Sequence, residues 1–199
     1  MGAASAKSKS CPYYITLSLA AQGLANLPDL WYTEGRVSYF WLKIDTLYQQ
    51  GGRLLQGDAA EIEKLAAGMQ RLESTDTGAP LADAIREHGT MVKFGPLDEG
   101  TVAQLDPTAD EIRINDGLKE ASPEVLAAHM AHEGTHVQWD APNSIDQEYH
   151  AFKAEAEVWN KVKGDQTDTQ CDAVSEMMAR GEAEAEEEIR QMYPELPEC

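Results

Sequence analysis

A five-residue pattern near the middle of the chain constrains its fold most. Residues 129–140 read HMAHEGTHVQWD and place His132, Glu133 and His136 in the spacing H-E-x-x-H. On an α-helix, residues four apart lie on one face about one turn apart, so the two imidazoles can bind one cation. Glu133 projects from an adjacent part of the helix, toward the space where a metal-bound water would lie. This arrangement predicts a metal site of the kind that zinc hydrolysis requires.

The residues around the pattern predict one continuous helix. Ser122 suits the N-cap and Pro123 the first helical position, and a turn sequence after Asp140 ends the helix. The inward stripe at helical spacing consists of Val125, Ala128, His129, His132, His136 and Trp139. Three histidines on an otherwise apolar stripe are hard to satisfy without a metal or acidic partners.

The next predicted helix, residues 145–162, offers a third ligand. Ser144 or Asn143 caps it, and Glu148 and Glu155 lie two turns apart on a face that is otherwise apolar. Because unpaired buried carboxylates are costly, this placement indicates metal ligation or a strong hydrogen-bond partner. We expect Glu148 to bind the metal and Glu155 to orient an imidazole N–H, and the reverse assignment stays open.

Two further residues are alternative partners of the site. Asp140 lies one turn after His136 and could orient its ring. His129 is either a satisfied core histidine or an additional group beside the metal.

The remaining periodic segments predict mixed secondary structure. Helices are expected over residues 29–50, 58–72 and 79–86, and short strands over 90–94, 101–105 and 111–115. The last two strands form a hairpin directly before the metal helix. The sequence therefore predicts an α+β fold with a small mixed sheet packed on helices.

The motif residues on these two predicted helices resemble those of a known protein family. H-E-x-x-H followed on the next helix by Glu148-x-x-Ala151 resembles the glutamate-zincins, the thermolysin-like clan of zinc metallopeptidases, and in particular its short bacterial members called minigluzincins. The resemblance implies a zincin-like fold, Zn²⁺ as cofactor, Glu148 as third ligand and a peptide or protein substrate. Glu148 follows His136 by only twelve residues, which keeps Glu155 open as the ligand.

In zincins, a sheet precedes the metal helix and its edge strand pairs with extended substrate. By resemblance, the candidate edge strand consists of Glu111, Ile112, Arg113, Ile114 and Asn115. The physical basis is that unpaired backbone groups on an edge bind a peptide backbone without reading its sequence.

The site residues predict a zinc-dependent endopeptidase. Glu133 is the expected general base, and the tetrahedral oxyanion needs a hydrogen-bond donor. The main candidates are Tyr149 and His150, with His129 and Tyr193 as further ones. Two alternatives remain: a non-enzymatic or latent zinc protein with a structural or covered metal, and a helical interaction protein without metal.

Charge and hydropathy exclude several classes of function. The chain has 16 basic and 35 acidic residues, giving a formal charge of −19, which argues against nucleic-acid binding and against attachment to anionic membranes. No apolar run is long enough to span a bilayer. The N-terminal segment is a poor secretion signal because Gln22 and Gly23 interrupt its apolar stretch. The compartment is left open, with the cytoplasm slightly favoured.

Three regions are expected along the chain. Residues 1–74 are a helical N-terminal extension, residues 75–165 the zincin-like catalytic unit, and residues 166–199 an acidic C-terminal helix and tail. The helix is expected to run through about Tyr193, with the acidic run 182–188 solvated. A carboxylate or thiolate of the tail is a candidate plug for the open metal position.

Overall fold

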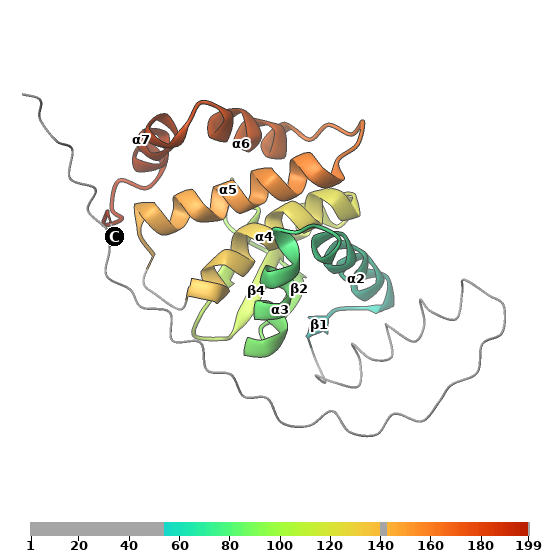
Figure 1. Ribbon diagram of the computed structural model, residues 1–199. Coiled ribbons are helices and arrows are strands. Elements are labelled where there is room, and N and C mark those ends of the chain that lie inside the picture. Colours follow the sequence, from blue (N-terminus) through green and yellow to red (C-terminus); the bar gives the residue numbers. More distant parts are fainter. Residues whose placement is uncertain (1–53, 140–142, 199) are drawn as a thin grey trace, which may run out of the picture.

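The computed structural model describes residues 54–139 and 143–198, and it is a mixed α+β fold (Figure 1). Within these residues lie a four-stranded sheet and six helices. In chain order they are β1 (Leu55–Gln56), α2 (Ala59–Glu73), α3 (Gly78–His88), β2 (Met91–Gly95), β3 (Ala103–Asp106), β4 (Glu111–Asn115), a 3₁₀ turn (Asp116–Leu118), α4 (Pro123–Trp139), α5 (Ile145–Val162), α6 (Thr169–Ala179) and α7 (Glu182–Met192). The helix predicted over 29–50 lies outside the described residues.

The two helices that carry the metal-site residues begin where their caps predict. In α4, the Val125 N–H donates to the Ser122 hydroxyl at 3.3 Å, and Pro123 is the first helical residue. In α5, the Ser144 hydroxyl accepts the Gln147 N–H at 3.2 Å. These side chains satisfy N–H groups that have no partner within the helix. The caps therefore fix where each helix starts, and with it which residues face inward.

The sheet corrects one prediction. Its strand order is β1-β2-β4-β3, with β2 parallel and β3 antiparallel to β4. The segment Glu111–Asn115 is therefore an interior strand, and β3 forms the edge that borders α4. The reason is burial: Ile112 and Ile114 are fully buried between β2 and β3, whereas the side chains of β3 are only half-buried or exposed. Alternating polarity predicts both strands of a hairpin but not which of them pairs outward.

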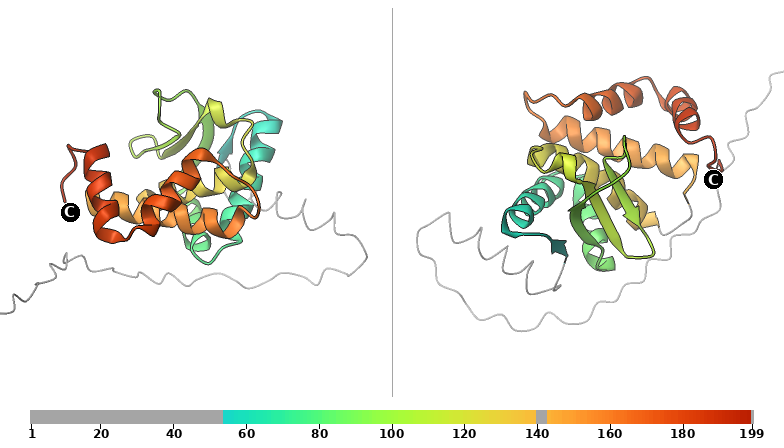
Figure 2. Two further views of the ribbon diagram at one scale, coloured as in Figure 1. Left: turned by 90° about the horizontal axis from the view of Figure 1, so that it is seen from above. Right: turned by 180° about the vertical axis from the view of Figure 1, so that it is seen from behind.

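Helix α4 lies at the centre of the molecule. It packs on α2, α3 and α5 and against β3, and Figure 2 shows the sheet lying along one side of it. Gly134 permits the close approach of α3, because a Cβ there would lie 3.1 Å from the Leu81 Cβ and 3.3 Å from the Ile85 Cδ1. Trp139, predicted to face inward, is 38% exposed, and its ring lies 5.0 Å from that of His150 at a tilt of 52°. The buried stripe of α4 therefore ends at His136 and Val137.

Two C-terminal helices replace the single predicted one. The chain turns at Gly181, whose φ of 106° is readily adopted only by glycine, and this lets both α6 and α7 pack on α5. In the acidic run, Glu182, Glu184 and Glu187 are exposed, as predicted, whereas Glu186 and Glu188 are half-buried and pair with Arg190 and Arg180. No helix in residues 54–139 and 143–198 is both long and apolar enough to cross a membrane.

The described part of the tail lies against the start of α5. The N–H groups of Ile145 and Asp146 donate to the carbonyls of Pro197 and Glu198, at 2.8 and 3.2 Å. The Glu198 carboxylate pairs with Arg190 at 3.1 Å, so it is not the predicted plug. Cys199 lies outside the described residues.

Candidate metal centre

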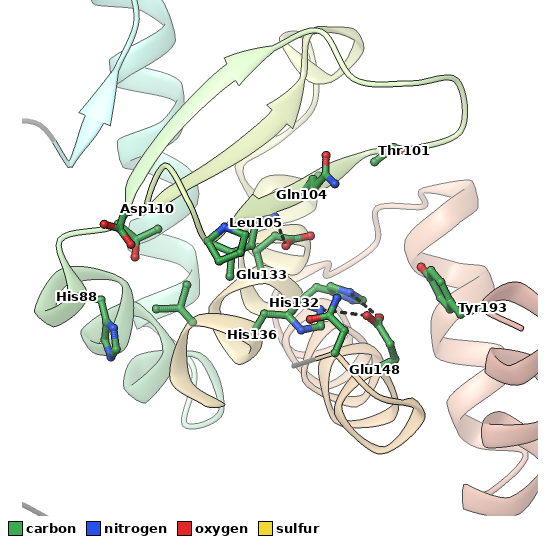
Figure 3. A pocket seen from close by; sticks show the side chains of 15 residues that line it. His88, Thr101, Gln104, Leu105, Asp110, His132, Glu133, His136, Glu148 and Tyr193 are labelled. Carbon is green, nitrogen blue, oxygen red and sulfur yellow. Dashed lines mark hydrogen bonds and ion pairs between the residues drawn. The ribbon is translucent and has the colours of Figure 1, made fainter. Parts of the chain in front are cut away.

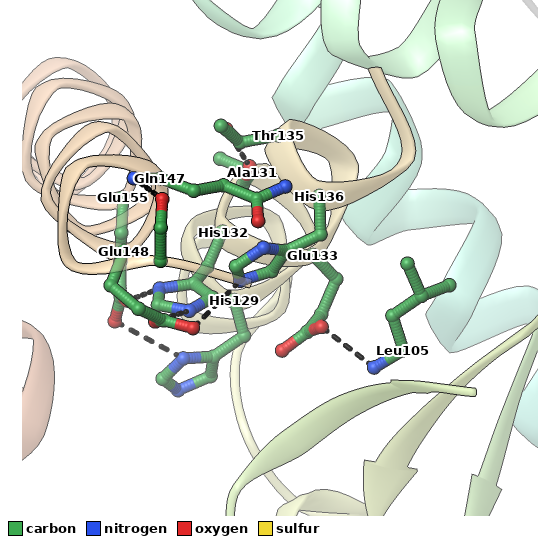
Figure 4. A network of polar contacts seen from close by, with 11 residues as sticks. Leu105, His129, Ala131, His132, Glu133, Thr135, His136, Gln147, Glu148 and Glu155 are labelled. Carbon is green, nitrogen blue, oxygen red and sulfur yellow. Dashed lines mark hydrogen bonds and ion pairs between the residues drawn. The ribbon is translucent and has the colours of Figure 1, made fainter. Parts of the chain in front are cut away.

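Three side chains from α4 and α5 converge on one point. The Nε2 atom of His132 lies 3.4 Å from Glu148 Oε2, and that of His136 lies 3.6 Å from Glu148 Oε1 (Figure 4). One ligand atom from each of the three residues lies within 4.8 Å of the others. Ligand atoms about 2.0–2.1 Å from a tetrahedral ion are roughly 3.3 Å apart. His132, His136 and Glu148 can therefore hold a metal ion with little rearrangement.

Glu155 lies on the opposite side of His132. Its Oε2 is 3.1 Å from His132 Nδ1, and its Oε1 is 3.2 Å from His129 Nδ1. The structure thus brings Glu148 to the Nε2 atoms and Glu155 to an Nδ1 atom. A carboxylate on the far nitrogen fixes the tautomer and the orientation of a metal-binding imidazole.

Gln147 is a residue that the sequence analysis missed. Its side chain is 1% exposed, and Figure 4 shows the amide beside the ring of His136. Neither His136 Nδ1 nor the Gln147 amide atoms have a hydrogen-bond partner among the described residues. Burial lowers the pKa of His136, whereas the Gln147 amide raises it by a smaller amount. The sequence feature that could have identified Gln147 is its position, because it directly precedes the candidate ligand Glu148 in the first turn of α5.

Glu133 lies between the metal-site residues and the edge strand. It is 5% exposed, and its Oε2 accepts the backbone N–H of Leu105 in β3 at 2.7 Å. Burial raises the pKa of this carboxyl, although the charge of His132 and the hydrogen bond from Leu105 oppose the rise. A carboxylate with a raised pKa, held beside a metal site, has the properties of a general base.

The buried carboxylates and imidazoles of the site shift one another's pKa values. Burial lowers the pKa of His132, but hydrogen bonds with Glu148 and Glu155 outweigh this effect and raise it to about 10. The pKa of His136 falls to about 4, through burial and the charge of His132. Burial alone would raise the pKa of Glu155, yet hydrogen bonds with His129 and His132 lower it to about 2. Buried carboxylates that stay ionised require a positive partner, which a proton on His132 or a metal ion supplies.

The site opens into a cavity of about 860 Å³ (Figure 3). His132, Glu133, His136 and Glu148 line it, and Gln104 and Leu105 of β3 form part of its wall. A second cavity, of about 340 Å³, shares His132 and Glu133 with the first and extends toward α6 and α7. The metal-site residues are therefore accessible from the side that faces the edge strand.

The two main predicted oxyanion donors, Tyr149 and His150, do not line this cavity. Tyr149 is buried against α6 and α7, and His150 is 43% exposed and lies 3.8 Å from Asp146. Both follow Glu148 directly on α5, so the helix turns them away from it by about 100° and 200°. Tyr193 lines both cavities, and its pKa is raised to about 12 by burial and by Glu148 and Glu133. Asp140 lies outside the described residues.

Comparison of the chain with family models, curated proteins and solved structures finds no match. The chemistry of the site therefore rests on its own geometry. That geometry is two imidazoles and a carboxylate converging beside a second, buried carboxylate at an open cavity.

Proposed function

We propose that the protein is a zinc-dependent peptidase with a zincin-like site. The observation that carries this proposal is the convergence of His132, His136 and Glu148 beside Glu133, on the wall of an open cavity. Two histidines and a glutamate are a known ligand set of catalytic zinc, which keeps its fourth position for water or substrate. A zinc ion bound there would supply an activated water and a Lewis acid for a peptide carbonyl.

The protein's own residues provide the proton transfers and the positioning. Glu133 accepts a proton from the attacking water and later donates it to the leaving amine. Glu155 keeps the Nε2 atom of His132 directed at the metal through its contact with Nδ1. Tyr193, whose raised pKa keeps its phenol protonated, is the donor best placed to bind the developing oxyanion.

Strand β3 is the proposed substrate-binding edge. Among the described strands it pairs with β4 alone, and the Leu105 N–H on its other side points to Glu133. A peptide extended along this edge would receive backbone hydrogen bonds and pass Glu133. The edge strand that the resemblance to zincins implies is therefore assigned to Ala103–Asp106 instead of the 111–115 segment.

A purely structural zinc site is less consistent with the geometry. Structural sites are closed by four protein ligands. Here three candidate ligands border a cavity of about 860 Å³. A cavity of this volume beside the ligands leaves room for water and for a peptide carbonyl.

The test is a substitution that separates metal binding from catalysis. Glu133→Gln should retain zinc at the wild-type stoichiometry but reduce peptide hydrolysis by roughly 10²- to 10⁴-fold, because the base is lost. Metal content and digestion of casein or a peptide library, with and without a chelator, are the measurements. Glu184→Gln, at an exposed position of α7, is the matched control. Wild-type hydrolysis by the Glu133 variant, or none by the zinc-loaded wild type, would refute the proposal.

A further inference from the structure

A second buried cluster lies behind the candidate metal centre. His129, Glu155 and Cys171 are 2%, 2% and 0% exposed, and each offers a ligand atom within 4.8 Å of the others. His129 comes from the same face of α4 as His132, one turn earlier, and Cys171 comes from the first turn of α6. By residue type alone, this cluster resembles a metal site as closely as the first one does.

Its geometry indicates a hydrogen-bonded chain instead. The carboxylate lies 3.2 Å from His129 Nδ1, whereas the Cys171 sulfur lies 3.9 Å from Nε2 of the same ring. The shortest contacts of the carboxylate and the thiol are therefore to opposite nitrogens of one ring, and they do not converge on a single nitrogen. In the first site, by contrast, both imidazoles direct Nε2 toward the same carboxylate.

The donors and acceptors of the cluster follow from its contacts, because a carboxylate placed between two imidazole nitrogens accepts from both. The two oxygens of Glu155 face His132 Nδ1 and His129 Nδ1, so both rings donate from Nδ1. On His129, Nε2 then carries a lone pair that accepts the S–H of Cys171. On His132, Nε2 is the atom that would bind a metal ion after losing its proton.

We propose that His129 and Cys171 are positioning residues for the metal ligand His132, acting through Glu155. The chain of contacts runs from Cys171 in α6 to His129, Glu155 and His132. His129 Nδ1 lies 3.2 Å from the second oxygen of Glu155, and this contact holds the carboxylate in its orientation toward His132. Cys171 selects the tautomer of His129 that donates to Glu155. This inference rests on the proposed metal centre.

The tautomers can be measured on the full-length wild-type protein. Imidazole ¹⁵N NMR should show His129 protonated at Nδ1 and not at Nε2, with slow exchange of that proton because the ring is buried. An Nε2-protonated His129 would overturn the proposal. This measurement needs neither activity nor a substituted protein.

Zinc affinity, measured by competition with a chromophoric chelator, tests the positioning role. His129→Leu should weaken binding by up to about tenfold, less than Glu155→Ala, because His129 acts through Glu155 and not directly on His132. His129→Asn should recover most of the loss, because its amide can donate from near the position of Nδ1. Cys171→Ala should weaken binding by roughly two- to tenfold, and Cys171→Ser should restore it.

Val125→Ala is the matched control. Val125 is buried in the same apolar cluster as Cys171, one turn before His129, but has no polar contact with the chain. It should lower the melting temperature and leave zinc affinity unchanged. Equal affinity losses in Val125→Ala and His129→Leu would reduce the effect to packing and overturn the inference. Unchanged affinity in His132→Ala would refute the metal centre itself, whereas unchanged affinity in His129→Leu alone would refute only the positioning role.

Discussion

The two clusters on either side of His132 use similar residues in different ways. On the front, His132, His136 and Glu148 direct their ligand atoms to one point beside a cavity. On the back, His129, Glu155 and Cys171 are more deeply buried, and the thiol and the carboxylate face opposite nitrogens of one ring. Residue types and proximity therefore do not suffice to define a metal site. The ligand atoms must also direct their lone pairs at a common point.

The largest effect should follow from removing the front carboxylate. Glu148→Ala removes one of the three candidate ligands, so zinc affinity should fall by roughly 10²- to 10³-fold. The free energy of zinc binding at structural sites, ~10–16 kcal/mol, comes from only a few ligands, so the loss of one is large. Metal content after gel filtration and a competition titration measure this loss. Asp146→Ala, one of the half-exposed acids on α5, is the control. Stoichiometric zinc retained at wild-type affinity in Glu148→Ala would show that the front cluster is not the site.

Removing the back carboxylate should have a smaller effect. Glu155→Ala leaves the three ligands in place but removes the partner of His132 Nδ1, so zinc affinity should fall by about 10- to 100-fold. The same titration compares it with Glu148→Ala. If the loss in Glu155→Ala exceeded that in Glu148→Ala, the roles of the two glutamates would be exchanged.

Sequence periodicity predicted both glutamates but could not assign them. Glu148 and Glu155 share one face of α5, so a stripe treats them alike, and only their placement against the two nitrogens of His132 distinguishes them. The limits of α4 and α5 were predictable because Ser122, Pro123 and Ser144 are local signals. Two features of the tertiary structure could not be predicted from local patterns. One is which strand of the hairpin pairs with β2, and the other is that Tyr193, and not Tyr149, lines the cavity.

Acidity should weaken the front cluster specifically. Zinc must displace the proton from His132 Nε2, and the pKa of His132 is raised to about 10, so this competition spans the neutral range. Each unit of falling pH should therefore weaken apparent zinc affinity about tenfold. Glu155, with a pKa lowered to about 2, stays ionised throughout. Competition titrations at pH 6, 7 and 8, corrected for protonation of the chelator, measure the slope, and a flat profile would contradict the prediction.

The smallest effect is expected from Cys171→Ser, because we expect no metal ion to bind at the back cluster. Wild type and Cys171→Ser should bind the same number of Co²⁺ ions and show the same absorption spectrum. The reason is that in the wild type Cys171 remains a protonated thiol that donates to His129 and does not bind the ion. Burial raises the pKa of this thiol, which opposes the deprotonation that metal binding requires. The comparison isolates Cys171 from the other cysteines, since both proteins retain them. A sulfur-to-cobalt charge-transfer band present in wild type and lost in Cys171→Ser would make the back cluster a second metal site. The two clusters would then differ in accessibility and not in chemistry.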